Sequence, residues 1–372
     1  MFGRTILKWV MLATNFGAVL FMLIALAGTV ISPEKFIFPA YFALFYPLII
    51  FTNIAFVIFW LLARKWFFLL SLAVLLFSSE QINETFPIHV GKTEFKRVVK
   101  PVQFLTYNTM VCGKLEKHTR KKPNKVIQYI LDSDADIVCL QEFTVSKKKE
   151  YLTHADILRI FNKYPYKHIQ YKQKVNTRIS GVATFSKFPI VNKQTINFPS
   201  KYNISIYSDI DIHGRTIRVI NNHLESNRLT ENDKKMPYVL RNKFDTERLT
   251  GITLHFSKKL GVAYRLRAVQ ADAVAKAIET SPYKIILCGD FNDVPGSYAY
   301  TKVKGKLKDA FEETGTGLGW TFNERFYRFR IDYMMYDSTA FVPIEYKADH
   351  VNYSDHYPVL CRFGFNYETA IK

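Results

Sequence analysis

The sequence predicts an α/β domain preceded by a transmembrane helical region. Apolar residues dominate the first 80 of the 372 residues, in runs long enough to cross a bilayer. From residue 102 onward, short β-branched runs alternate with segments of helical periodicity. This alternation is typical of an α/β domain with two packed sheets, or with one large sheet that has helices outside.

Three apolar segments occupy the N-terminal region. Residues 7–31 and 36–63 are each long enough to span about 30 Å of hydrocarbon, which takes about 20 helical residues. Residues 66–79 are short for a span and equally suit a helix that lies at the interface. A signal peptide would be shorter and would end in a small-residue cleavage site, so we expect a retained anchor in an integral membrane protein.

The side of the membrane on which the large domain lies depends on the third apolar segment, residues 66–79. The basic residues Arg4, Lys8, Arg64 and Lys65 place the chain before the first span and after the second span inside. If the third segment also spans, the large domain is extracytoplasmic, and this is the orientation that we favour. If the third segment is only interfacial, the domain is cytoplasmic.

Residues 81–100 are predicted to form a linker, and residues 101–366 to form the α/β domain. The chain carries a net charge of +19, most of it after residue 80. A basic domain favours an anionic partner such as nucleic acid, a phospholipid headgroup or another phosphate ester, but a solvated basic surface has the same composition. Basic clusters occur at Lys114–Lys125, Lys147–Lys149, Lys172–Arg178 and Lys234–Lys235.

The four cysteines, Cys112, Cys139, Cys288 and Cys361, do not have the spacing of metal ligands. Cys139 and Cys288 fall inside apolar strand runs, where a free cysteine behaves as a small buried hydrophobe. We therefore expect buried thiols, and a disulfide is possible only if the domain is extracytoplasmic.

The patterns of the α/β domain predict individual strands and helices. Strands are expected at residues 102–106, 136–140, 181–186, 204–212, 216–221, 285–288, 331–336 and 359–365. Helices are expected at residues 123–131, 151–164 and 266–278. His213 and Gly214 are expected to form a hairpin turn between two of the strands.

Acids, amides and histidines stand beside several of these strands. In the stretch KIILCGDFND, residues 284–293, an apolar strand ends at a glycine and is followed by Asp290 and Asn292. Open α/β sheets bind ligands at the carboxyl ends of their strands. Four other blocks place polar residues in the same way: Asn108, Glu142 and His223 follow strands, and Asp355 with His356 precedes one.

The composition of these blocks favours phosphoryl chemistry with a hard cation. No Gly-rich phosphate loop, HExxH, GxSxG or zinc-ligand spacing occurs, so nucleotide triphosphate hydrolysis and serine or zinc protease chemistry have little support. Carboxylate and amide oxygens are typical ligands of Mg²⁺. Histidines such as His223 and His356 donate to a phosphoryl oxygen or move a proton near neutral pH.

Seven blocks resemble, in order, the motifs of the endonuclease/exonuclease/phosphatase family, which includes DNase-I-like nucleases, neutral sphingomyelinases and inositol polyphosphate phosphatases. They are TYN at 106–108, QE at 141–142, SGVATFSKFPI at 180–190, NNHLES at 221–226, GDFND at 289–293, RIDYMM at 330–335 and SDHYPV at 354–359. The resemblance covers about residues 102–365 and implies a DNase-I-like two-sheet α/β sandwich. The main departure is an insertion at about residues 229–264.

The resemblance also implies a divalent metal site that binds Mg²⁺, with Mn²⁺ as an alternative. Glu142 would bind the metal, and Asn108 would help to order the metal site. Asp355 would act as a further carboxylate, either bound to the metal or beside it.

Five residues are implied to act on the phosphoryl group. Asp290 would orient and deprotonate the attacking water, and Asn292 would hold water or phosphate. His223 would donate to a non-bridging oxygen. His356 would contact the phosphoryl group, with Asp332 accepting a hydrogen bond from its other ring nitrogen.

These implications predict a membrane-anchored, metal-dependent phosphoesterase that hydrolyses a phosphodiester or a phosphomonoester with water. The substrate stays open between nucleic acid and a phospholipid headgroup, as in enzymes of sphingomyelinase type or in lipid-anchor remodelling. A binding module without catalytic activity is the alternative from another class. The sequence does not indicate an oligomeric state.

Overall fold

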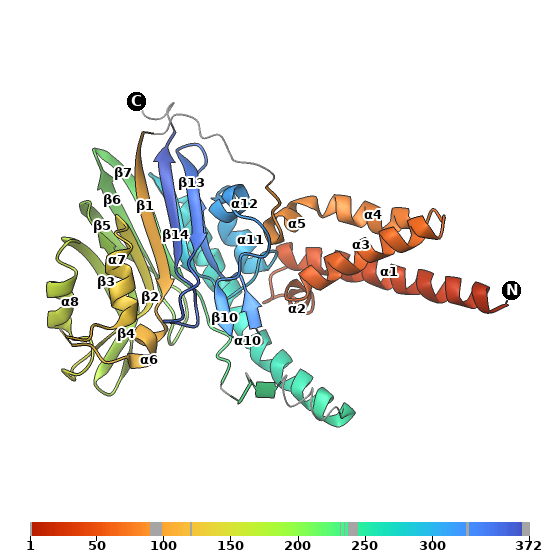
Figure 1. Cartoon of the computed structure of the whole chain (residues 1–372), viewed down its shortest axis with the longest axis horizontal. Helices are drawn as coiled ribbons and strands as arrows, with labels where there is room; N and C mark the ends of the chain where they lie inside the picture. The colour runs from red at the N-terminus through yellow and green to blue at the C-terminus, as the bar shows by residue number, and fades with distance from the viewer. Residues whose placement is uncertain are drawn as a thin grey trace.

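The computed structural model describes residues 2–89, 99–119, 121–230, 232–233, 235–236, 245–324 and 327–366. It consists of a group of N-terminal helices that projects from a two-sheet sandwich with outer helices (Figure 1). The two parts pack against each other through an apolar cluster that contains Ala43, Val294 and Ile331.

The N-terminal part contains the helices α1 (Phe2–Val30), α2 (Ala40–Ala43), α3 (Tyr46–Leu62), α4 (Phe68–Phe77) and α5 (Ser79–Thr85). Among the described residues, only α1 contains a stretch long and apolar enough to cross a membrane, Thr5–Val30, with a mean hydropathy of 2.2. The helices α3 and α4 are apolar but shorter. A 10-residue helix such as α4 rises about 15 Å, about half of a hydrocarbon core.

The expected second span, residues 36–63, is wrong as a single helix. Pro39 is the N-cap of α2, and Pro47 lies in the first turn of α3. Because proline has no N–H to donate, it is tolerated at helix starts and interrupts helix interiors. The apolar run therefore forms one short helix followed by a longer one.

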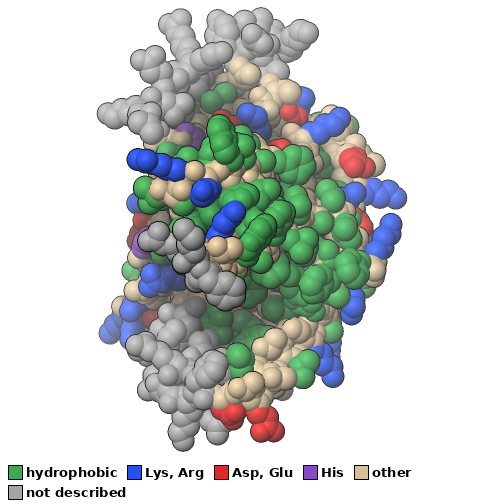
Figure 2. All heavy atoms as spheres, turned by 90° about the vertical axis from the view of Figure 1, so that its right-hand side faces the viewer, with side chains coloured by type: hydrophobic (Ala, Val, Ile, Leu, Met, Phe, Trp, Pro, Cys, Tyr) green, Lys and Arg blue, Asp and Glu red, His purple; other side chains and the backbone are tan. Residues whose placement is uncertain are grey.

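Polar side chains lie at the centre of the N-terminal helices and apolar side chains lie outside. Asn15 of α1 donates to Ser71 of α4 (2.6 Å) and accepts from Trp60 of α3 (2.9 Å), while Ser71 donates to Asn53 of α3 (3.0 Å). All four are buried. Figure 2 shows apolar side chains gathered over the outer face, with Lys and Arg among and around them; Leu62 is 80% exposed. This distribution is typical of helices that pack in lipid.

The sandwich contains two six-stranded sheets with the orders β13-β14-β1-β2-β4-β3 and β5-β6-β7-β8-β12-β9. The first sheet consists of β1 (Val99–Asn108), β2 (Ile137–Ser146), β3 (Tyr166–Val175), β4 (Arg178–Ser186), β13 (Phe341–Ala348) and β14 (Val359–Phe365). The second consists of β5 (Ile190–Ile196), β6 (Ser205–Ile212), β7 (Arg215–His223), β8 (Lys284–Asp290), β9 (Lys308–Asp309) and β12 (Asp332–Tyr336). A small hairpin, β10 (Phe322–Glu324) and β11 (Tyr327–Phe329), stands apart.

The remaining elements lie outside the sheets. They are α6 (Met110–Leu115), α7 (Lys125–Asp132), α8 (His154–Ile160), α10 (Thr246–Glu279), α11 (Tyr298–Lys304) and α12 (Ala310–Thr314). The helices α7 and α8 pack on the first sheet, and α10 and α11 pack on the second. Every strand and helix predicted between residues 102 and 365 is present, and the DNase-I-like two-sheet sandwich is confirmed.

Apolar side chains from both sheets form the central core. Phe104 and Cys139 of the first sheet pack in one cluster with Val219, Ile286 and Cys288 of the second. All four cysteines are free and buried, as the apolar strand runs predicted. Since both sheets are covered on both faces, the polar side chains at their strand ends are held on a rigid frame.

The helix α5 ties the N-terminal part to the sandwich. Glu84 accepts from Lys304 of α11 (2.7 Å), and its backbone carbonyl accepts from the buried guanidinium of Arg330. The carbonyl of Pro87 accepts from the backbone N–H of Gly317 (3.0 Å). The expected linker, residues 81–100, is therefore wrong for residues 81–85, which are helical and packed; residues 90–98 lie outside the described residues.

Candidate active site

The register of the strands brings the predicted site residues to one edge. The strands β7 and β8 pair in parallel with His223 opposite Asp290, and β12 pairs antiparallel to β8 with Asp332 opposite the same Asp290. In the other sheet, β1 and β2 run parallel, and their pairing ends at Asn108 and Gln141, where β1 ends and β2 continues. These strand ends carry the site.

The carboxylate of Asp290 is the centre of the contacts. Its Oδ2 accepts hydrogen bonds from the side-chain amides of Asn108 (2.8 Å) and Asn292 (3.1 Å), and its Oδ1 accepts from the backbone N–H of Asn292 (2.7 Å). Asn292 adopts a left-handed φ of 53°, which asparagine tolerates better than most residues. The side chain of Asp290 is thereby held in one orientation, and it is completely buried.

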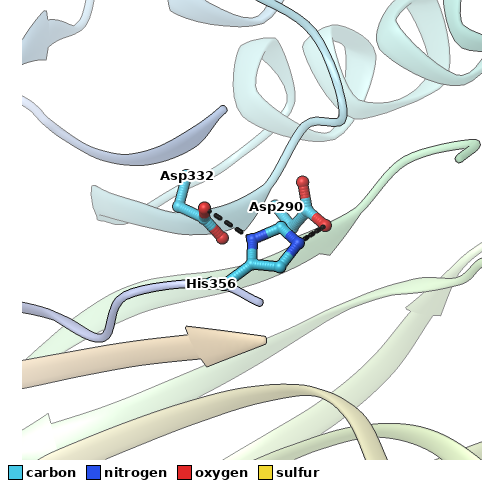
Figure 3. A group of neighbouring side chains, drawn as sticks. All are labelled: Asp290, Asp332 and His356. Atoms are coloured by element: carbon cyan, nitrogen blue, oxygen red, sulfur yellow. Dashed lines mark hydrogen bonds and ion pairs between the residues drawn. The ribbon is translucent and has the colours of Figure 1, made fainter. Parts of the chain in front are cut away.

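The ring of His356 lies between two carboxylates (Figure 3). Its Nδ1 is 2.8 Å from Oδ2 of Asp332, and its Nε2 is 3.9 Å from Oδ2 of Asp290. The ring of Phe322 packs edge-on against it, with 5.1 Å between ring centroids. Nε2 of the second histidine, His223, lies 3.8 Å from the same oxygen of Asp290.

The two histidines have opposite pKa shifts. Burial alone would lower the pKa of His356, but the carboxylates of Asp332 and Asp290 outweigh it and raise the pKa to about 10. Burial, together with the nearby His356, lowers the pKa of His223 to about 3. Near neutral pH the site therefore holds one imidazolium and one neutral imidazole, a division typical of acid–base sites.

The surroundings of Glu142 and Asp290 disfavour the ionised form of both side chains. Burial raises the pKa of Glu142, and the neighbouring carboxylate of Asp355 raises it further, although hydrogen bonds from Asn108 and the backbone of Val111 oppose this. Burial also raises the pKa of Asp290. A bound cation would remove this penalty, because it favours the charged form of each carboxylate.

The donors fit a hard divalent cation. Asp290 and Asp332 each place a carboxylate oxygen within 4.8 Å of a ring nitrogen of His356 and of each other, and the protonated ring is their positive partner and not a ligand. Oδ1 of Asp332 is buried and has no hydrogen-bond partner among the described residues. The carboxylates Glu142 and Asp355 lie close enough to repel each other. An oxygen-rich, crowded and incompletely bonded set of this kind is what Mg²⁺ or Mn²⁺ binds.

Backbone strain accompanies the acidic side of the site. Residues Met110–Leu115, assigned to α6, all have positive φ between 44° and 70°, and Glu142 has a φ of 52°. Left-handed backbone costs about 1–2 kcal/mol per residue for residues other than glycine. Strain of this kind is commonly concentrated at functional sites.

A cavity of about 330 Å³ opens beside these residues. Its lining includes Glu142 and His223, together with Ser180, Tyr202 and Arg228. The volume lies at the lower end of the range for small-molecule sites. The eight predicted residues thus occupy one edge of the sandwich: six are joined by the short distances above, and Glu142 and Asp355 adjoin them.

Two positioning residues were not predicted as members of the site. Oγ of Ser354 donates to the backbone carbonyl of Asn108 (2.8 Å) and accepts from the backbone N–H of His356 (3.2 Å). Oγ1 of Thr321 accepts from the backbone N–H of Asp332 (3.0 Å). Ser354 is part of the SDHYPV block, whereas Thr321 stands in a segment without any sequence signal.

The comparisons with known proteins agree with this architecture. The sequence model of the Endonuclease/Exonuclease/phosphatase family matches residues 105–356. A model described as a domain of unknown function, DUF8431, matches residues 8–85. No curated protein matches the chain.

Solved structures with this topology share little sequence with the chain. The catalytic domain of human Nocturnin with bound sulfate is 16% identical, with a TM-score of 0.49, over 73% of this chain and 97% of that one. The 3′ phosphatase NExo from Neisseria, bound to a product DNA hairpin, is 16% identical, with a TM-score of 0.48, over 72% of this chain and 100% of that one. The family match covers more than half of the chain, and this chain therefore belongs to the endonuclease/exonuclease/phosphatase family.

Proposed function

We propose that this protein is a membrane-anchored, divalent-metal-dependent phosphoesterase that hydrolyses a phosphodiester with water. The observation that carries the proposal is the convergence of Asn108, Asn292, His223 and His356 on the single buried carboxylate of Asp290. Burying a carboxylate in this way lowers the stability of the folded protein. A side chain with a purely structural role would not need to carry such a charge, so a functional role is favoured.

Each side chain suits a step of the hydrolysis. Asp290, with its raised pKa, accepts the proton of the attacking water. Asn292 holds Asp290 in place and lies beside the water. His223 is neutral, and its Nε2 has no hydrogen-bond partner among the described residues, so as the Nε2–H tautomer it donates to a non-bridging oxygen. His356, held by Asp332, presents a positive charge to the phosphoryl group.

The metal ligands in this proposal are Glu142 and Asp355, with Asn108 ordering them. When bound, Mg²⁺ or Mn²⁺ supplies positive charge for the phosphoryl oxygens. Glu142, Asp355 and Asn108 would hold the metal beside the cavity, which both Glu142 and His223 line.

The helix arrangement supports an extracytoplasmic domain, because α5 follows α4 directly at Ser78 and the two helices together lead back to the sandwich, where Glu84 is bound. The ammonium of Lys8 lies 5.4 Å from the ring of Phe67, so the start of α1 lies beside the turn that contains Arg64 and Lys65. Figure 1 places this turn at the end of the helices farthest from the sandwich. If the basic end is inside, the sandwich is outside. Protease treatment of intact cells that leaves the sandwich uncut would contradict this orientation.

The function is tested with the full-length protein in detergent or nanodiscs. Hydrolysis of bis(4-nitrophenyl) phosphate, plasmid DNA and phospholipids is followed with Mg²⁺, with Mn²⁺ and with a chelator. We expect turnover of the aryl phosphodiester that requires metal and is lost in Asp290→Ala. The exposed Asp132→Asn serves as a control with unchanged turnover. Equal turnover with metal and with chelator would contradict the metal requirement.

A further inference from the structure

A second cavity of about 330 Å³ adjoins the site between α10 and the loop that follows β7. Its wall on the side of α10 contains the apolar residues Val262, Ala263 and Leu266, and Lys258 and Lys259 contribute their aliphatic stems. This helix belongs in part to the insertion at residues 229–264. None of the site residues proposed above lines this cavity.

The two cavities are neighbours. Ser226 and Arg228 line both of them. The guanidinium of Arg228 forms an ion pair with Glu225 and stacks over the ring of Tyr202, 4.5 Å from its centroid. Arg228 therefore stands at the boundary, and a ligand with its phosphate beside His223 would extend past it along α10.

The N-terminal helices pack on the side of α10 opposite the second cavity. The hydroxyl of Tyr41 from α2 donates to the carbonyl of Ser257 (2.8 Å), and its ring packs on Tyr264; both residues of α10 are about half a turn away from the lining residues Val262 and Leu266. The face between presents Leu254 (66% exposed), Lys258 and Val262 (55% exposed) at a spacing of four residues. Exposed apolar side chains thus lead along α10 from the face packed on the N-terminal helices to the margin of the cavity.

The charges beside the cavity suit an anionic amphiphile. Lys259 and His255 are paired with the buried Asp233, whereas Lys258 forms no ion pair with the described residues. An aliphatic wall next to a free ammonium group matches an alkyl chain that is attached to a phosphate.

We propose that the second cavity binds an acyl or alkyl chain of a membrane phospholipid whose phosphodiester occupies the site. This inference rests on the proposed function and names its substrate class. The lipid would enter along α10, with Arg228 contacting its phosphate and Val262, Ala263 and Leu266 contacting its chain.

The test uses full-length protein in nanodiscs and a series of alkyl 4-nitrophenyl phosphates with methyl, hexyl and dodecyl chains. The phosphodiester and the leaving group are the same in all three, so kcat/KM reports the contribution of the chain. We expect kcat/KM to rise by about tenfold or more from methyl to dodecyl, because apolar contacts in a pocket discriminate by such factors.

Two variants locate the effect. Ala263→Phe fills the cavity and should lower the ratio of kcat/KM for the dodecyl ester to kcat/KM for the methyl ester to near one. Thr253→Phe adds the same ring at an exposed position of α10 and should leave this ratio unchanged. If Ala263→Phe does not fold, Val262→Glu at the exposed margin makes the same test, with thermal melting as the check of folding.

The outcomes separate the inference from the proposed function. Hydrolysis of all three esters at equal rates, or a preference only for DNA, would overturn the inference and leave the phosphoesterase proposal standing. If no ester is hydrolysed, the proposed function fails, and binding is then measured with a dodecyl phosphate that carries a photoreactive diazirine. Cross-links to residues 254–266 of α10 would support the lipid site, and cross-links elsewhere would overturn it.

Discussion

Nδ1 of His356 lies 2.8 Å from Oδ2 of Asp332, and both side chains are buried. The contact fixes the plane of the imidazole, and the Asp332 carboxylate is the largest of the influences that raise the pKa of His356 to about 10. The orientation and the basicity of the His356 ring therefore depend on a residue of β12.

Replacing Asp332 with asparagine should lower kcat/KM for a phosphodiester by about 100-fold, because an amide does not stabilise the imidazolium. The pKa of His356 should fall toward its ordinary value, so that the loss grows as the pH rises. The pH–rate profile and the NMR titration of the ring measure this. Unchanged titration of His356 would show that Asp332 acts only in packing.

Asp290→Asn should abolish turnover with little change in stability. Burial already disfavours the charged form of Asp290, since its pKa is raised. An amide of the same shape removes that penalty, but its nitrogen cannot accept the hydrogen bonds that one of the two carboxylate oxygens receives from Asn108 or Asn292. Because the two effects oppose each other, we expect a melting temperature close to that of the wild type with turnover lower by orders of magnitude. The exposed Asp132→Asn is the matched control. A variant that melts well below the wild type would assign Asp290 a structural role.

Addition of Mg²⁺ or Mn²⁺ should raise the melting temperature. A ligand that binds only the folded state stabilises it by about 2.7 kcal/mol at 100 times its Kd. The variant Glu142→Gln keeps the size of the side chain but loses its charge, and it should show a much smaller shift. The measurement does not depend on any substrate. An equal shift in both proteins would exclude Glu142 as a ligand.

The pair of His168 on β3 and Ser208 on β6 links the two sheets and should make stability sensitive to acid. Nδ1 of His168 lies 2.9 Å from Oγ of Ser208, and burial, with a smaller effect of Lys193, lowers the pKa of His168 from 6.5 to about 4. Between these values the unfolded state binds more protons, so the unfolding free energy falls as the pH falls from 6.5 to 4. We expect a loss of about 2 kcal/mol. In the His168→Gln variant, the unfolding free energy from thermal melts should fall less steeply between pH 6.5 and pH 4.

Lys304→Met should destabilise the junction between the N-terminal helices and the sandwich. Lys304 neutralises Glu84 and Glu312, and both carboxylates are largely buried. Leaving a buried charge unpaired costs about 3 kcal/mol. Adding Glu84→Gln to Lys304→Met should recover part of the loss in a thermal melt. The same cost in both variants would show that the ammonium acts through packing.

The polar edge of the sandwich could be predicted because its residues follow apolar strands directly in sequence. Asn108, Glu142, His223 and Asp290 each stand at the end of, or just beyond, a run of buried residues, and parallel strands bring such ends together. Their mutual distances could not be predicted, since the register of β12 against β8 decides which atoms of Asp332 and Asp290 meet His356.

The strands that the sequence did not predict lie at or near the edges of the sheets. The edge strand β13 contains Pro343, which reads as a break but is tolerated where no neighbour needs its N–H. In β3, lysines and other polar residues separate the apolar residues, so the strand has no continuous apolar run. The start of α10 was missed because Gly251 and Gly261 interrupt a weakly amphipathic pattern.

The contacts of Glu84, Pro87 and Tyr41 with the sandwich have a consequence for the reach of the enzyme. A domain on a flexible tether samples a range of heights above a surface, and its local concentration of surface groups falls as the tether lengthens. If the N-terminal helices lie in the bilayer, as we propose, they brace the domain directly, so the folded chain sets the elevation and tilt of the site above the bilayer. Only ester bonds that lie at that elevation above the bilayer would reach the site.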